Sequence, residues 1–290
     1  MNVNRIERFY NIGRIQRCAA IEQGKSSDAK CVTSSAGRFV LRKLRNQQQA
    51  VNEDRLHRVL SLHHISPALV NTRNGGSYVR DHDGIYNLQH YIEGTRPFNQ
   101  ASIQFVYFGQ MLAQFHSLIG RLEIADQPDR FALPLLWAQV CDKVRGSSSA
   151  VIGSLEEHVQ RCMTYAVRDE GVVHGDLGVW NMLFTEQRTV LIDFGEARRG
   201  DPHFDAAAVL TSMIPEAAAE HEFFSALEDV MRGYAEAGGL LTKERLYEQI
   251  HLWMLRGWLA SIRERGVTSP VVRYIEQGMQ RIITLNRMIL

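Results

Sequence analysis

Three polar residues stand beside short apolar runs in the segment 171–205. Two residues separate Asp176 from a preceding pair of valines, Asn181 precedes a Met-Leu-Phe run, and Asp193 directly follows the apolar run 189–192. The junction of a strand and a loop holds a side chain firmly while leaving it open to a cleft. Two carboxylates and one amide oxygen are hard ligands that suit Mg²⁺, which also shares phosphate oxygens. This set predicts phosphoryl transfer, which needs charge neutralisation at the phosphates and an acceptor for a hydroxyl proton.

The order and spacing of these residues form two motifs. His174, Asp176 and Asn181 give H-x-D-x-x-x-x-N, and Asp193 opens an Asp-Phe-Gly triplet. Both motifs match the catalytic-loop and metal-binding signatures of protein kinases, except that Gly175 stands where arginine is usual. Each residue also has an ordinary alternative as a turn or strand-end residue. Their joint occurrence favours the catalytic interpretation.

The His-Gly-Asp variant, with a Gly-Asp-Pro triplet at 200–202, resembles the aminoglycoside phosphotransferase and choline kinase superfamily. That superfamily also contains homoserine kinase and methylthioribose kinase enzymes. The resemblance covers nearly the whole chain and thins outside residues 171–205. It implies that Asp176 is the catalytic base for a substrate hydroxyl and that Asn181 and Asp193 bind Mg²⁺.

Three further residues of this segment receive supporting roles from the resemblance. His174 would be structural and would tie the catalytic loop to the metal loop by a hydrogen bond. Asp201 and Asp205 would brace the loop and helix that follow, and their residue type also suits helix capping.

The resemblance also places a nucleotide site in the first third of the chain. A cation on the strand 39–42 would grip the α- and β-phosphates of ATP or GTP. Arg42 is the preferred residue, and Lys43 is the alternative on the opposite face of the strand, because strand side chains alternate. Glu53, early in the next predicted helix, would pair with that cation.

Two backbone contacts to the nucleotide are expected. The turn 24–28 would cover the phosphates through the N–H groups of Gly24, Ser26 and Ser27, although it lacks the G-x-G-x-x-G form of protein kinases. The hinge at 88–92 would bind a purine through the backbone of Gln89 and Tyr91.

The predicted fold is α+β: a bilobal protein-kinase-like fold with a small antiparallel sheet in the N-lobe and a larger, mostly helical C-lobe. The N-lobe, residues 1–93, would cover the nucleotide with a sheet and one helix, and the C-lobe, residues 94–290, would carry the catalytic loop, the metal loop and the substrate-binding helices. Glycine and proline within 93–97 mark the boundary. Apolar spacing predicts strands at 15–21, 30–33, 38–42, 68–72, 77–80 and 85–92. It predicts helices at 47–62, 102–122, 223–237, 243–261 and 271–290.

Composition narrows the class of protein. The 290 residues carry a formal net charge of +1, which supplies no overall field for nucleic acid or anionic membrane. No stretch has the roughly 20 apolar residues of a membrane span, and no apolar core of a secretory signal begins the chain. The four cysteines are far apart and are expected to be buried free thiols in a reducing compartment. A soluble cytoplasmic protein of undetermined oligomeric state is expected.

The acceptor stays open among amino-alcohols, hydroxy-amino acids, sugars and aminoglycoside-like antibiotics. Residues 207–290 hold ten acidic and nine basic side chains, so charge does not favour a polycation. Trp253, Trp258 and Tyr234 are candidates for an aromatic box around a quaternary amine, but their helical spacing is more typical of core residues.

Two other functions compete with a small-molecule kinase. One is a nucleotide-binding regulatory module on the same scaffold without transfer activity. The other is a two-metal phosphoesterase built on His174, Asp176, Asp193 and His203. Protein phosphorylation is disfavoured because only nine residues separate Gly195 from Asp205, too few for the usual peptide-docking loop.

Overall fold

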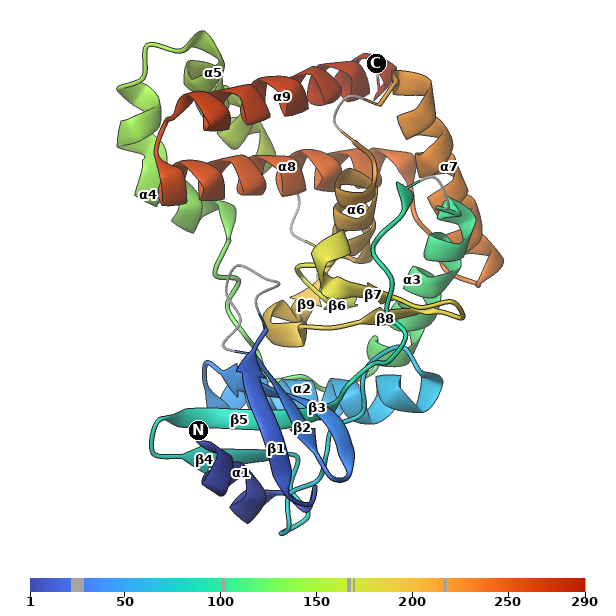
Figure 1. Ribbon diagram of the computed structural model, residues 1–290. Helices are drawn as coiled ribbons and strands as arrows, with labels where there is room; N and C mark the ends of the chain where they lie inside the picture. The colour runs from blue at the N-terminus through green and yellow to red at the C-terminus, as the bar shows by residue number, and fades with distance from the viewer. Residues whose placement is uncertain (22–28, 101–102, 166–167, 169, 216–217, 290) are drawn as a thin grey trace. The chain divides into compact units, whose positions relative to one another are not determined.

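The computed structural model describes residues 1–21, 29–100, 103–165, 168, 170–215 and 218–289 (Figure 1). The chain forms two compact units. The first unit contains residues 1–98, 118–127 and 180–198, and the second contains 99–117, 128–179 and 199–290. Each unit therefore joins segments that are far apart in the sequence, whereas the sequence pattern predicts one division at residues 93 and 94.

An antiparallel sheet with the strand order β1-β2-β3-β5-β4 forms the centre of the first unit (Figure 1). Its strands are β1 (Ile15–Ala20), β2 (Lys30–Ser34), β3 (Gly37–Leu44), β4 (Tyr78–Asp81) and β5 (Gly84–His90). Alternation along β3 buries Arg42 and exposes Lys43, and the register sets Arg42 opposite Asn87. The prediction of a strand at 68–72 is wrong. Leu69 and Thr72 form only isolated bridges there.

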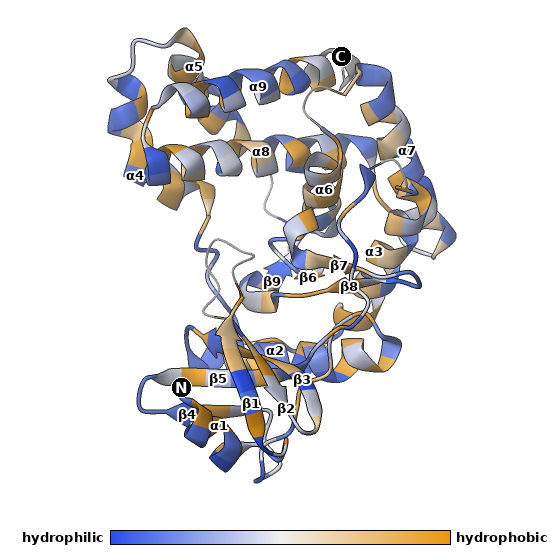
Figure 2. Cartoon of the chain, in the orientation of Figure 1, coloured by the Kyte–Doolittle hydropathy of each residue, from blue (hydrophilic) through white to orange (hydrophobic). Residues whose placement is uncertain are grey.

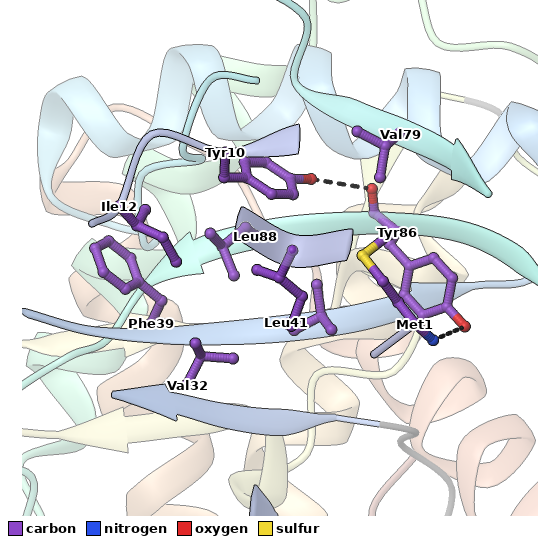
Figure 3. Close-up of a cluster of buried hydrophobic side chains, with 10 residues drawn as sticks. Met1, Tyr10, Ile12, Val32, Phe39, Leu41, Val79, Tyr86 and Leu88 are labelled. Atoms are coloured by element: carbon purple, nitrogen blue, oxygen red, sulfur yellow. Dashed lines mark hydrogen bonds between the residues drawn. The ribbon is translucent and has the colours of Figure 1, made fainter. Parts of the chain in front are cut away.

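A helix near the N-terminus, α1 (Val3–Phe9), packs on this sheet, although the polar sequence there did not predict one. Asn2 caps it, and Ile6 is its buried residue. Figure 3 shows Tyr10 and Ile12, which follow the helix, packed with Leu41 and Leu88 of the sheet. Tertiary packing rather than local propensity therefore stabilises so short a helix.

The first unit also contains α2 (Gln47–Leu60), a short hairpin and short 3₁₀ turns, among them most of η3 (Val179–Asn181). Asn46 caps α2 by accepting a hydrogen bond from the Gln49 N–H, and a 3₁₀ turn (Ser61–His63) follows the helix. The predicted helix at 47–62 therefore ends two residues early. The hairpin pairs β7 (Met182–Phe184) with β8 (Thr189–Leu191), and the turn η4 (Phe194–Glu196) follows it.

Helices make up most of the second unit (Figure 1). They are α3 (Phe105–Ile119), whose last residues belong to the first unit, α4 (Leu133–Arg145), α5 (Ala150–Met163), α6 (Pro202–Met213), α7 (Glu220–Glu236), α8 (Lys243–Arg265) and α9 (Ser269–Ile289). Between them β6 (Gly171–Val173) pairs with β9 (Arg198–Gly200). Helix α6 is buried on nearly every side, whereas hydrophobic and hydrophilic residues alternate along α9 (Figure 2). Helix α6 therefore forms the centre of this unit.

Two further features concern the class of protein. Within the described ranges, the helices include none with the length and apolar content needed to cross a bilayer. The cysteines Cys18, Cys31, Cys141 and Cys162 are free thiols, as expected. Only Cys162 is buried, so the expectation that all four are buried is wrong.

Candidate active site

The predicted catalytic loop leaves β6 at His174 and reaches the partly exposed Asp176. The backbone N–H groups of His174 and Gly175 donate to the two carboxylate oxygens of Asp205 at 2.7 and 3.0 Å. Gly175 has φ of 80°, a conformation that side chains disfavour, which explains why this loop carries glycine. The loop backbone is therefore fixed two residues before the predicted base.

Asp205 is completely buried in α6 and has a third partner. His116 Nε2 lies 3.1 Å from its carboxylate, and His116 Nδ1 lies 3.0 Å from the Tyr234 hydroxyl. Burial by itself raises the pKa of a carboxyl, but His116 and His174 outweigh it and lower the pKa of Asp205. The loop is therefore held by a carboxylate that stays charged.

Asp201 caps α6 by accepting a hydrogen bond from the His203 N–H at 2.9 Å. Its carboxylate also binds the His203 ring at 2.6 Å and forms an ion pair with Arg245. Burial opposes ionisation, yet these partners lower the pKa of Asp201 to about 2. Asp201 thus fixes the start of the helix that carries Asp205.

Asn181 and Asp193 come from the same end of the β7–β8 hairpin. Met182 pairs with Leu191, and the Ile192 N–H donates to the Asn181 carbonyl at 3.0 Å. Asn181 therefore stands opposite the residue that precedes Asp193. The register of this hairpin brings the two predicted metal ligands into the same neighbourhood of the first unit.

Asp193 adopts a left-handed backbone conformation, with φ of 62° and ψ of 65°. Such a conformation costs a residue with a side chain on the order of 1 kcal/mol, although aspartate tolerates it better than most. The strand ends there and the chain turns into η4, while the Asp193 side chain stays 36% exposed. Strain of this kind persists only where the surrounding contacts fix it.

Arg42 links two carboxylates that are far apart in the sequence. It forms an ion pair with the fully buried Glu53 at 3.1 Å and a second one with Asp193. Burial by itself lowers the pKa of a guanidinium, but these two carboxylates hold the Arg42 pKa above its ordinary value. The pairing of Glu53 with Arg42 rather than with Lys43 is present in the structure.

Glu53 is held in place by two neutral side chains. Gln49 and Asn87 each donate to its carboxylate at 2.8 Å. With Arg42, these donors satisfy a charge that burial would otherwise make costly. Glu53, itself fixed by these hydrogen bonds, thus orients Arg42 toward Asp193.

Residues 17–253 match the phosphotransferase enzyme family APH. The chain belongs to this family. No curated protein sequence matches the chain.

Solved structures support the same fold at low sequence identity. Amicoumacin kinase hAmiN is 14% identical, with a TM-score of 0.73, over 94% of this chain and 91% of that one. An aminoglycoside phosphotransferase from Alicyclobacillus acidocaldarius is 17% identical, with a TM-score of 0.70, over 98% and 94%. The choline kinase LicA from Streptococcus pneumoniae is 14% identical, with a TM-score of 0.65, over 93% and 94%. The predicted superfamily and protein-kinase-like fold are therefore confirmed.

Two predicted nucleotide contacts of this APH-family chain are less well defined. The Tyr91 N–H already donates to the Arg38 carbonyl at 3.2 Å, and Gln89 pairs with Val40 within the sheet. A purine contact at this hinge stays a prediction, and it would need other backbone groups than the Tyr91 N–H. Gly24, Ser26 and Ser27 lie outside the described residues.

Sequence reasoning missed three residues around η4 of this phosphotransferase-family chain. Arg45 forms an ion pair with Glu196 and donates to the Gly195 carbonyl, and Gln127 donates to the same carbonyl at 2.6 Å. The one available signal was the position of Glu196 directly after Asp-Phe-Gly. Arg45 and Gln127 carry no motif, since only the folded chain brings them there.

Two of the alternatives fit the structure poorly. Trp258 is completely buried and Tyr234 is 5% exposed, so these two aromatic residues belong to the core rather than to an open box. His203 uses both ring nitrogens inside the protein, on Asp201 and on the Thr242 N–H at 2.9 Å. It therefore does not fit the role of a metal ligand in a phosphoesterase.

Proposed function

We propose that this chain transfers the γ-phosphoryl group of ATP or GTP to a hydroxyl group of a small molecule. The observation that carries the proposal is the chain of contacts from buried Glu53 through Arg42 to Asp193. A buried carboxylate that holds a permanent cation beside a partly exposed carboxylate is an arrangement suited to phosphate and a divalent ion together.

The donor set around Asp193 fits Mg²⁺. Asn181 and Asp193 would hold the ion through an amide oxygen and a carboxylate, with waters and phosphate oxygens completing its preferred oxygen shell. When bound, Mg²⁺ supplies charge neutralisation at the β- and γ-phosphates. The left-handed backbone of Asp193 fits this role, because strained residues concentrate at binding sites.

The remaining chemistry falls to the residues of the chain. Arg42 would bind the α- and β-phosphates, exchanging its contact with Asp193 for contact with the nucleotide. Asp176 would orient the acceptor hydroxyl and accept its proton at a carboxylate oxygen. Asp205 would keep the Asp176 loop in one conformation through the His174 and Gly175 amides.

Structural relatives support a nucleotide and a small acceptor. The amicoumacin kinase was solved with AMP-PNP, Ca²⁺ and Ami, LicA was solved with AMP, and another phosphotransferase was solved with GDP and kanamycin. The nucleotides in these complexes carry either adenine or guanine. The acceptor class, the choice between ATP and GTP and a cytoplasmic location stay predictions for this chain.

The test is transfer of ³²P from γ-labelled ATP or GTP, with Mg²⁺, to a panel of amino-alcohols, hydroxy-amino acids, sugars and aminoglycosides. Asp176→Asn should lower turnover on the best acceptor by about 10²–10⁴-fold while nucleotide affinity changes little. The matched control is Asp142→Asn on the exposed face of α4. Nucleotide binding without transfer to any acceptor would instead favour a regulatory module, and full turnover by Asp176→Asn would remove the assigned base.

A further inference from the structure

Arg45, which belongs to none of the sequence motifs, forms two contacts with the short turn η4 that follows Asp193. Arg45 lies immediately before the Asn46 cap of α2, and its guanidinium reaches both the Glu196 carboxylate and the Gly195 carbonyl. The Arg45 side chain is 31% exposed and that of Glu196 is 10% exposed. An arginine with two acceptors on one turn restrains both the position and the orientation of that turn.

Two glutamines complete this contact. Gln127 donates to the Gly195 carbonyl at 2.6 Å, so that oxygen accepts from two side chains. The Gln49 side chain accepts from the Arg45 N–H at 2.9 Å and donates to Glu53 at 2.8 Å. Gln49 therefore connects Arg45, which contacts η4, with Glu53, the carboxylate that positions Arg42.

Close packing makes the turn sensitive to this grip. A Cβ atom added at Gly195 would lie 3.0 Å from Gln49 Nε2 and 3.1 Å from Asp193 Oδ1. The backbone of η4 therefore has little room to move without moving the Asp193 carboxylate. The left-handed conformation of Asp193 persists only where the surrounding structure fixes it, and Arg42 contacts the Asp193 side chain.

We propose that Arg45, acting through Glu196 and the Gly195 carbonyl, is a positioning residue for the divalent-ion site at Asp193. This inference rests on the proposed function. Arg45 contacts the turn that follows Asp193, and it would thereby fix the backbone from which the ligand extends. Groups that orient a metal ligand from outside its first shell commonly change metal affinity by 10–100-fold when they are removed.

The experiment measures Mn²⁺ binding by equilibrium dialysis at saturating AMP-PNP, so no acceptor is needed. Arg45→Gln and Glu196→Gln should each weaken Mn²⁺ binding by about 10-fold. The double variant should weaken Mn²⁺ binding little more than Arg45→Gln alone, because Arg45→Gln already removes the contact that Glu196→Gln breaks. Binding of metal-free AMP-PNP should stay within about twofold of wild type, a split that general destabilisation would not produce.

The matched control is the exposed pair Arg96–Glu186 in the same unit, through Arg96→Gln and Glu186→Gln. If Arg45→Gln unfolds, Arg45→Lys serves in its place, because it keeps the charge but loses the fork that reaches both acceptors. Mn²⁺ affinity in the Arg45 variants equal to that of the Arg96 controls would overturn the inference. Failure of the proposed function would give a different result. In that case Asp193→Ala would bind Mn²⁺ as tightly as wild type.

Discussion

Each unit has a buried carboxylate, and the two carboxylates bind different kinds of partner. Glu53 in the first unit binds side chains, namely Arg42, Gln49 and Asn87. Asp205 in the second unit binds the backbone amides of His174 and Gly175 and the His116 ring. A guanidinium can exchange one partner for another without moving its strand, whereas a backbone amide moves only with its loop. The first unit therefore presents a cation held by side-chain contacts, and the second holds a loop through its backbone.

The largest expected effect comes from breaking the backbone contact. Asp205→Asn replaces one acceptor oxygen by an N–H₂ group that faces another donor in a fully buried position. The unfolding free energy should fall by about 3–4 kcal/mol, because a buried donor is left unsatisfied and a charged hydrogen bond is lost. Urea unfolding measures it, with Asp229→Asn on α7 as the control. A loss below about 1 kcal/mol would mean that Asp205 does not fix this loop.

Acid should weaken both units, because each buries a neutral histidine. Burial lowers the pKa of His57 in the first unit to about 4 and that of His251 in the second to about 3. Below about pH 6.5 the unfolded chain therefore binds more protons than the folded chain. The unfolding free energy has its full value above that pH and falls as the pH is lowered toward 4. For His57 the loss approaches about 3 kcal/mol.

Unfolding measured from pH 7 to pH 4, in wild type and in His57→Gln, separates the two contributions. The variant should lose the part of the pH slope that belongs to His57 and keep the part that belongs to His251. An unchanged slope would show that His57 is not buried in its neutral form.

Changing Glu53 should have a smaller effect on stability and a different effect on ligands. Glu53→Gln removes one of the two carboxylates of Arg42 but leaves Asp193, so the expected loss is about 2 kcal/mol. Nucleotide affinity should fall about 10-fold because Arg42 is no longer aimed at the phosphates. Asp205→Asn should instead lower turnover more than nucleotide affinity. Equal effects of both variants on nucleotide binding, measured by calorimetry, would erase the distinction between the two carboxylates.

The smallest effect on stability should come from the exposed ion pair Arg96–Glu186, which includes none of the predicted site residues. Arg96 and Glu186 are 63% and 67% exposed, and solvent screens such pairs strongly. Arg96→Ala should change the unfolding free energy by less than about 1 kcal/mol. Thermal unfolding at low and high salt checks it, and a large loss would show that exposure is a poor guide to the importance of an ion pair here.

The sequence predicted what local patterns encode. Most strands of the sheet follow from alternation, and the superfamily follows from the resemblance that the motifs carry. The roles of Asp176, Asn181 and Asp193 in catalysis and metal binding stay predictions. The choice of Arg42 over Lys43 as the partner of Glu53 also followed from the resemblance and from strand alternation.

What the sequence could not predict depends on contacts between distant segments. Arg45 and Glu196 are 151 positions apart, and neither periodicity nor residue type signals their pairing. The helix α1 depends on packing against the sheet, and the segment 68–72 pairs only at isolated positions. The resemblance gave Asp205 a bracing role for the loop and helix that follow, but nothing in the sequence signals that it would bind the earlier backbone amides of His174 and Gly175.

The most direct test is a crystal structure of the complex with Mg²⁺ and AMP-PNP. The Asn181 amide oxygen and an Asp193 carboxylate oxygen should lie about 2.0–2.1 Å from the ion, with the Asp176 carboxylate facing the γ-phosphate. Arg42 should have left Asp193 for the phosphates while keeping Glu53. A structure in which the carboxylates of Asp176 and Asp193 open onto separate surfaces, with the nucleotide bound elsewhere, would contradict the proposed phosphotransferase site.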